Sequence, residues 1–223
     1  MVLKYVAHSK KVLQIAIEQG WHPGARYTNM RDVRNFAFKN IGFLDIDWKN
    51  YSFTKHLEQA AAHQPKITIA RDVECIFQLD SILKEAEELS KYSKHVCIVP
   101  KDKKLENRLD QLIPKDFLLA YSVPTKYGGT SVSTNSFDRP VHLLGGRPDI
   151  QRMLGDKLKV FSLDCNRFTI DAMYGDYFDG NKFRCHPSGG YEVCLYESIK
   201  NISALWCDYE TDCLATEIIR SAI

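Results

Sequence analysis

The feature that most constrains the fold of this chain is a regular alternation of short apolar runs and amphipathic stretches between residues 41 and 164. The apolar runs have the composition of strands, and the stretches between them repeat apolar residues at helical spacing. Such alternation indicates βαβ units and a parallel sheet. We expect strands at residues 41–47, 67–72, 96–100, 117–123, 141–144 and 159–164, and helices at residues 53–62, 76–89, 105–112 and 148–154.

A weaker strand at residues 3–7 and a helix at residues 10–19 precede this region, and residues 21–40, which contain Pro23 and Gly24, predict a loop. The seven candidate strands are best fitted by an α/β fold of the (β/α)8 TIM-like barrel type, compact or incomplete, because such barrels usually need about 250 residues. A doubly wound open sheet is the alternative, although the chain lacks the GxGxxG turn of that fold.

Residues 175–223 have a different pattern and predict a helical C-terminal tail. Asp179 and Gly180 mark a turn within a small hairpin, and residues 191–206 and 211–221 are helical in pattern. We therefore expect one domain over residues 1–223, which divides into an N-terminal strand and helix region (1–40), a barrel core (41–174) and the hairpin and helical tail (175–223).

The composition indicates a protein with a substantial core and no membrane partner. Hydrophobic residues make up 44% of the chain, and no apolar run approaches the roughly 18 residues of a membrane span. The N-terminal residues lack the apolar region of a signal peptide. Seven cysteines, without the spacing of a disulfide framework, indicate reduced thiols and a cytoplasmic location.

Three of the expected strands end in aspartate: Asp45 and Asp47 on the first, Asp72 on the second and Asp164 on the last. Side chains alternate along a strand, so each acid shares one face with small or polar neighbours and opposes large apolar ones. We expect these apolar residues, among them Ile67, Ile69 and Phe161, to pack against the outer helices. We expect these carboxylates to point into the barrel at its C-terminal end, where such folds place their chemistry. The alternative is that each aspartate caps the helix that follows it.

Basic residues outnumber acidic ones between Lys94 and Arg167. This excess favours a surface for a polyanion such as nucleic acid. A solvated basic face without a ligand is the alternative.

The order of two motifs resembles the tRNA-guanine transglycosylase superfamily. VHLLGGRPDI at residues 141–150 is followed by VFSLDCNRF at residues 160–168, where the family has an LMG-type strand and then a strand ending in FDC. The stretches LDIDWKNYSFTKHLEQAAAHQPKITIARD and DAMYGDYFDGNKF are more similar to the short phage-type relatives. Those relatives resemble DNA-guanine transglycosylases, which insert 7-deazaguanine bases into DNA.

The resemblance implies a role for each strand-end acid. Asp164 matches the covalent nucleophile, and Asp72 matches the acid that binds the Watson–Crick edge of the purine. Asp45 or Asp47 matches an acid for base binding or proton transfer, and alternation does not choose between them.

Other matched positions would surround the base. Leu144 and Gly145 match the residues that flank it, and residues 122–129 would present backbone amides, including those of Ser122, Gly128 and Gly129, to the purine O6. Lys101 stands near the position of a base-contacting Gln, so that contact departs from the family. Basic residues would hold phosphates, and Tyr127 would stack on a base; the basic residues are Lys101, Lys103, Lys104, Lys126, Arg139, Arg147 and Arg167.

The resemblance also implies the partners, which are a free 7-deazaguanine base and nucleic acid. DNA is favoured over tRNA because no separate tRNA-binding region is apparent, and a phage-encoded protein would act in the host cytoplasm. A homodimer or an accessory subunit is left open. No cofactor is required. The family's CxCxxC zinc motif is absent, and packed reduced thiols are favoured over a zinc site in the tail residues Cys185, His186, Cys194, Cys207 and Cys213.

Two other functions compete with this one. Gly145, Gly146 and Arg147 precede a helix and could bind the phosphate of a small molecule through backbone amides. A non-catalytic accessory protein that binds nucleic acid is the third alternative.

Overall fold

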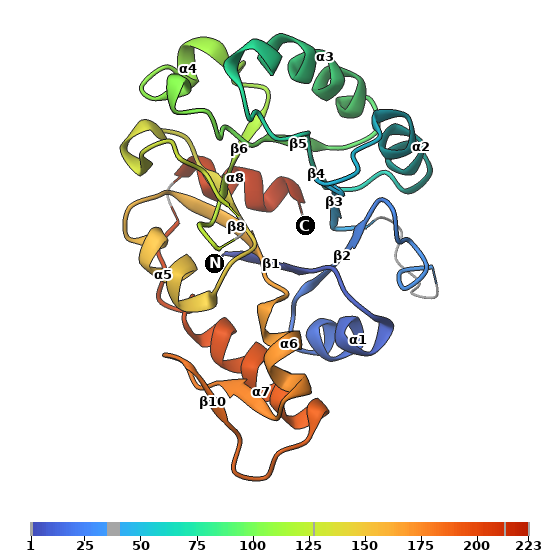
Figure 1. The fold of residues 1–223 in the computed structure, drawn as a ribbon, viewed down its shortest axis with the longest axis vertical. Helices are drawn as coiled ribbons and strands as arrows, with labels where there is room; N and C mark the ends of the chain where they lie inside the picture. Colours follow the sequence, from blue (N-terminus) through green and yellow to red (C-terminus); the bar gives the residue numbers. More distant parts are fainter. Residues whose placement is uncertain (1, 35–40, 127, 212, 223) are drawn as a thin grey trace.

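The computed structural model describes residues 2–34, 41–126, 128–211 and 213–222. Eight parallel strands close into a barrel surrounded by helices, as in a TIM-like fold (Figure 1). β8 pairs with β1 to close the barrel, which rules out the open sheet. The strands are β1 (Leu3–Val6), β2 (His22–Arg26), β3 (Phe43–Asp45), β4 (Ile67–Ile69), β5 (His95–Ile98), β6 (Leu118–Ser122), β7 (Val141–Leu144) and β8 (Val160–Asp164).

The strand that the sequence did not predict is β2, which lies where we expected a loop. It pairs in parallel with β1 and with β3, so its neighbours impose an extended backbone on a sequence with little strand preference. Gly24 fits this position because a Cβ there would lie 3.1 Å from Phe43 Cδ1. The barrel therefore begins at β1 and not at residue 41.

The helices between the strands are close to those expected. α3 buries Leu79, Ile82, Ala86 and Leu89 along one side, which is the pattern that predicted it. Two predicted helices, at residues 76–89 and 105–112, instead combine a 3-10 turn with a shorter α-helix. The helices are α1 (Lys10–Glu18), α2 (Phe53–His63), α3 (Leu79–Ser90), α4 (Leu109–Leu112), α5 (Pro148–Gly155) and α6 (Arg167–Met173), with 3-10 turns η1 (Ile76–Gln78), η2 (Lys103–Leu105) and η3 (Thr134–Ser136).

The inside of the barrel is apolar near its floor, and this corrects the predicted orientation of two strands. Ile67 and Ile69 point inward, whereas Thr68 points outward and contacts His56 of α2. On β8, the pairing shifts by one residue beside Val141, so Phe161 occupies a bulge and also points inward. The apolar residues that fill the interior are Leu3, Tyr5, Phe43, Ile67, Ile69, Cys97, Val99, Ala120 and Phe161.

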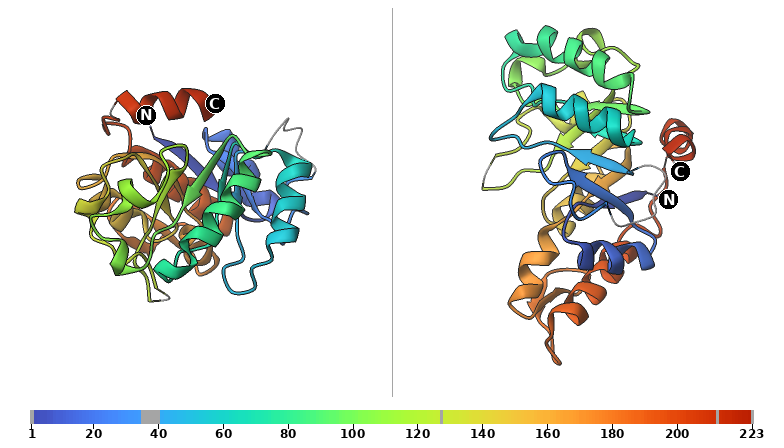
Figure 2. Two further views of the ribbon diagram at one scale, coloured as in Figure 1. Left: turned by 90° about the horizontal axis from the view of Figure 1, so that it is seen from above. Right: turned by 90° about the vertical axis from the view of Figure 1, so that its right-hand side faces the viewer.

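The tail has the predicted hairpin and helices. β9 (Asp176–Phe178) and β10 (Phe183–Cys185) form the antiparallel hairpin, and with α7 (Tyr191–Ala204) they extend the molecule beside α6 (Figure 1). α8 (Cys213–Ala222) packs Ala215 and Ile219 against the interior cluster. Ser221 Oγ lies 2.7 Å from His95 Nε2, at the start of β5. α8 therefore covers the N-terminal end of the barrel, as both views in Figure 2 show.

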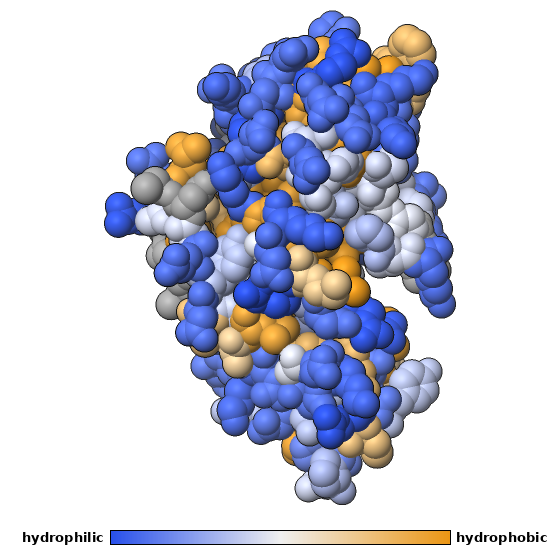
Figure 3. All heavy atoms as spheres, turned by 90° about the vertical axis from the view of Figure 1, so that its left-hand side faces the viewer, coloured by the Kyte–Doolittle hydropathy of each residue, from blue (hydrophilic) through white to orange (hydrophobic). Residues whose placement is uncertain are grey.

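Within the described residues, no helix is long and apolar enough to cross a membrane. The face drawn in Figure 3 is mostly hydrophilic, with apolar residues scattered through its middle. With its N-terminal end covered by α8, the barrel has one remaining end, where the loops that follow the strands gather.

Candidate active site

Asp164 is the last residue of β8 and lies in the mouth of the barrel. Its side chain is almost fully buried, with 6% exposed. One oxygen, Oδ1, accepts hydrogen bonds from Gly145 N at 2.8 Å and from the His142 ring at 3.3 Å. Gly145 adopts a positive φ of 63° to present its amide, a conformation that suits glycine. Strand β8 and the β7–α5 loop thus fix this carboxylate together.

Gln151 of α5 links these two segments from behind. Its fully buried side chain donates from Nε2 to Gly145 O at 2.7 Å and to Asp164 O at 2.8 Å. A buried amide that bridges two backbone carbonyls holds the loop and the strand end in one arrangement. Gln151 therefore sets the position of the Asp164 carboxylate without touching it.

Asp45, at the end of β3, is the second carboxylate in the mouth. Along β3, Asp45 lies on the same face as Phe43, which points into the barrel as predicted, and on the opposite face from Leu44. Burial, and then the charge of Asp164, raise the pKa of Asp45 to about 7, while Arg26 and the Ile46 amide act in the opposite direction. Arg26 Nε lies 4.0 Å from Asp45 Oδ2. The two acids therefore occupy one site and have different environments.

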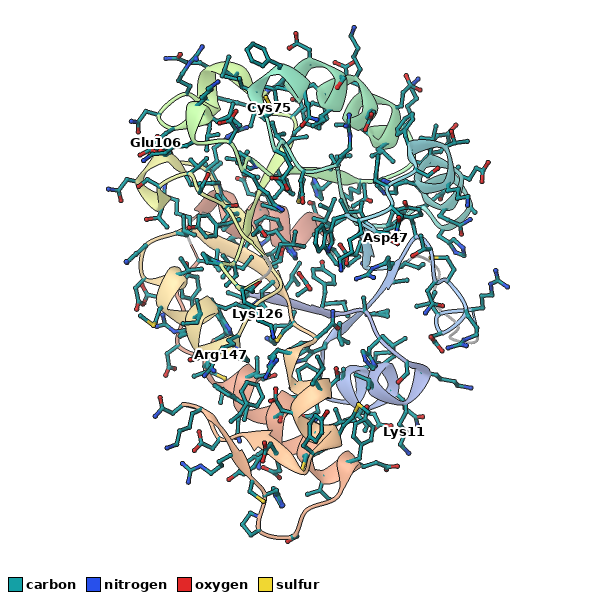
Figure 4. The ribbon with its side chains drawn as sticks, in the orientation of Figure 1. Lys11, Asp47, Cys75, Glu106, Lys126 and Arg147 are labelled. Carbon is teal, nitrogen blue, oxygen red and sulfur yellow. The ribbon has the colours of Figure 1, made fainter. Side chains whose placement is uncertain are left out.

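Asp47 belongs to a different environment. Its carboxylate accepts from Lys49 N at 3.3 Å in an exposed turn after β3, and Figure 4 shows it on the opposite side of the barrel from Arg147. The structure thus brings Asp45, and not Asp47, to Asp164.

Asp72 follows β4 and pairs with Lys101, which follows β5. Lys101 Nζ lies 2.7 Å from Asp72 Oδ2 and 3.0 Å from Glu74 Oε1. Burial raises the pKa of Asp72, and Lys101 opposes that rise. The charge of Asp72 also raises the pKa of Asp45, so the two acids share one neighbourhood. Among the described residues, no donor reaches the buried Asp72 Oδ1, so this oxygen has unused hydrogen-bonding capacity.

The β6–β7 loop uses several of its backbone groups within the protein. Ser122 N donates to Thr130 Oγ1 at 3.0 Å, and Gly128 N donates to Thr125 O at 3.1 Å. Two amides expected to receive a purine oxygen are therefore already bonded. Gly129 is required here because a Cβ would lie 2.6 Å from Pro124 Cα. Tyr127 lies outside the described residues.

The remaining predicted contacts lie at the mouth, at its rim and at the closed end of the barrel. Leu144 packs against the interior cluster. Arg167, at the start of α6, pairs with Asp171 at 2.8 Å and lies over the Phe183 ring. Arg139 precedes β7, at the closed end, and donates to the carbonyls of residues 113, 114 and 117. Arg139 therefore links two segments at the end of the barrel away from Asp164.

The sequence did not indicate four residues that contribute to the site: Arg26, His142, Gln151 and Ser162. For Ser162, the missing feature was its hydrogen bond to His142. Alternation along β7 would have placed His142 on the same inward face as Leu144, so its signal was present. Arg26 was not predicted because its strand, β2, lies where a loop was expected. Gln151 carries no local signal, since its role depends on two carbonyls from distant segments.

Within the described residues, no three His, Cys, Asp or Glu side chains lie close enough together to hold a metal ion. The fold and the acids at its mouth define a (β/α)8-barrel protein with a buried, carboxylate-lined site. The chain belongs to a family of unknown function (DUF6610), whose profile matches residues 16–207. The match runs from α1 into the segment after α7 and so includes every acid described above. No curated protein matches the chain.

Proposed function

We propose that this protein is a transglycosylase that exchanges guanine in nucleic acid, DNA by preference, for a 7-deazaguanine base. The observation that carries the proposal is the pair of acids in the barrel mouth. Asp164 is held by two hydrogen-bond donors, whereas burial and the charge of Asp164 keep Asp45 partly protonated near neutral pH. Two carboxyl groups with separated tasks are what glycosidic exchange with retention needs.

In the proposed reaction, an oxygen of Asp164 attacks C1′ of the target nucleotide. The bond between C1′ and guanine N9 breaks, and its electron pair leaves with the base. Protonated Asp45 supplies the proton that the departing guanine takes up. The incoming 7-deazaguanine then gives its N9 proton to the Asp45 carboxylate, and N9 displaces Asp164 from C1′. Each proton and each bond is thereby restored at the end of the cycle.

Asp72 and Lys101 suit the binding of a purine edge. The Asp72 side chain is 10% exposed and its Oδ1 has no donor among the described residues, so a small shift of the carboxylate would let it accept from the guanine N1 and 2-amino groups, while Lys101 holds Oδ2 at 2.7 Å. The same pattern of donors occurs on 7-deazaguanine bases that keep the guanine Watson–Crick edge. One acceptor can therefore bind both the leaving and the incoming base.

The rim of the mouth supports a nucleic-acid substrate. Trp48, in the loop after β3, is 53% exposed, with Lys49 Nζ 5.2 Å from its ring centroid. Phe77, after β4, is 86% exposed, with Lys104 Nζ 5.5 Å from its ring centroid. Exposed aromatic rings beside cations are a common platform for unstacked bases and their phosphates.

The small-molecule alternative receives less support. It requires the amides of the Gly145 loop to bind a phosphate, but Gly145 N already donates to Asp164. A phosphate at that position would also lie beside the Asp164 carboxylate, and the two negative charges would repel each other.

Base exchange tests the proposal. The substrates are single-stranded DNA, duplex DNA and the matching RNA, each with radiolabelled guanine. Each is incubated with the protein and 7-cyano-7-deazaguanine. The nucleic acid is then digested, and its nucleosides are analysed. We expect labelled guanine to be released and the new base to be incorporated. Asp164→Asn abolishes both, and Asp47→Asn, the matched control, retains them. Release of guanine without incorporation would indicate hydrolysis, and no release from any substrate would refute the proposal.

A further inference from the structure

We propose that His142 is a positioning residue, which binds one oxygen of Asp164 so that the other oxygen faces the sugar. This inference rests on the proposed function, because it assigns a role within that site. His142 lies on β7 and is fully buried, and its two ring nitrogens contact two side chains of β8. Nδ1 lies 2.7 Å from Ser162 Oγ, and Nε2 lies 3.3 Å from Asp164 Oδ1.

The direction of these bonds follows from the acceptors. A carboxylate oxygen that already receives an amide proton from Gly145 can only accept, so Nε2 must carry the proton that faces Asp164. Nδ1 is then free to accept from the Ser162 hydroxyl. Ser162 therefore fixes the tautomer, and His142 presents a donor to Asp164, in the way that a second residue orients a reactive group.

Aromatic rings hold His142 in place. Its ring stacks on Phe43 with a centroid distance of 5.0 Å, and the rings of Tyr5 and Phe161 lie 6.2 and 6.4 Å away. Such surroundings make an unbonded imidazole costly, since a buried polar group needs partners. The ring can satisfy both nitrogens only in the orientation that places Nε2 at Asp164.

Both donors to Asp164 bind the same oxygen. Gly145 N and His142 Nε2 converge on Oδ1, so the described part of the chain fixes the carboxylate on one side only. We assign Oδ2 as the oxygen that attacks C1′. Ser162 itself is excluded as a nucleophile because it is fully buried below His142.

Three substitutions separate positioning from a structural role. His142→Gln can keep a donor near the Nε2 position, His142→Asn keeps a polar group only near Nδ1, and His142→Phe keeps the aromatic packing without either bond. The rate of adduct formation with guanine-containing DNA is measured in a single turnover, alongside the thermal midpoint of each variant.

Positioning predicts that His142→Phe loses about 100-fold in rate, the size expected when a reacting group is misplaced, while the variant still folds, with only the moderate loss in thermal midpoint expected when the buried Ser162 hydroxyl loses its partner. His142→Gln should react faster than His142→Asn. Equal rates for Gln and Asn, or a wild-type rate in a folded Phe variant, would overturn the inference.

A readout without substrate keeps this test separate from the proposed function. The 15N spectrum of histidine-labelled protein, with His142 assigned by its loss in His142→Phe, reports which ring nitrogen is protonated. We expect a proton on Nε2 and none on Nδ1. Protonation of Nδ1 alone would overturn the positioning role, even if the protein exchanges bases. If the expected tautomer is found but no nucleic acid reacts, the proposed function fails and the geometry of the Asp164–His142 pair stands.

Discussion

Asp45→Asn should stabilise the folded protein in a way that depends on pH. The folded protein raises the pKa of Asp45 from 3.8 to about 7, so between these values the folded state binds a proton that the unfolded chain has lost. Stability therefore falls as the pH rises through this window, because ionised Asp45 is desolvated and lies near Asp164. Asparagine resembles the protonated acid and does not titrate.

The rise from 3.8 to about 7 corresponds to about 4 kcal/mol, at 1.36 kcal/mol for each pKa unit. We expect the variant and the wild type to have equal stability near pH 4, and the variant to gain progressively above it. The gain above pH 7 reaches at most about 4 kcal/mol, because 19% of the Asp45 side chain is exposed to solvent. Urea unfolding at several pH values measures this difference directly. Subtracting the wild-type curve removes the other groups that titrate in both proteins.

Asp47→Asn is the matched control, because it changes a neighbouring acid that lies in the exposed turn after β3. Its gain in stability over the wild type should be much smaller than that of Asp45→Asn. A gain for Asp45→Asn that is the same at pH 4 and pH 8 would refute the reasoning, since a pH-independent gain reflects packing and not a buried charge.

Three further predictions concern the surroundings of the acids. Gln151→Leu should lower the free energy of unfolding by about 2–4 kcal/mol, because two buried carbonyls lose their donor; urea unfolding measures it. Gly146→Ala should lower the free energy of unfolding by about 2 kcal/mol or more and reduce exchange, since the new Cβ would lie within 3 Å of Val123 and the φ of Gly146 is positive. Gly189→Ala is the control, because Gly189 also has a positive φ but its Cβ would meet no atoms within 4 Å. Lys101→Met should raise the pKa of Asp72, since Lys101 lowers it, and a carboxyl NMR titration would detect the rise.

The sequence predicted the barrel because seven of its strands carry their own pattern. Apolar runs between amphipathic helices need no knowledge of the neighbours, and the inward position of Asp45 and Asp164 followed from alternation alone. β2 could not be found in this way. Its residues, His22–Arg26, include Pro23 and Gly24 and become a strand only because β1 and β3 lie on either side.

Alternation failed where both faces of a strand are buried. Ile67 and Ile69 were expected to pack against outer helices, but the floor of a closed barrel is as apolar as its outer surface, so large side chains do not mark the outside. Phe161 was misplaced because a bulge adds one residue to β8. Gln151 could not be predicted, since its partners come from two segments that meet only in the folded chain.

The covalent intermediate tests the central claim most directly. The protein is incubated with a guanine-containing oligonucleotide in the absence of a free base, denatured, and analysed by intact mass and peptide mapping. We predict an adduct with the mass of protein plus oligonucleotide minus guanine, linked through Asp164 and absent from Asp164→Asn. An adduct on another residue, or guanine release with no adduct and no effect of Asp164→Asn, would contradict the assignment of Asp164 as the nucleophile.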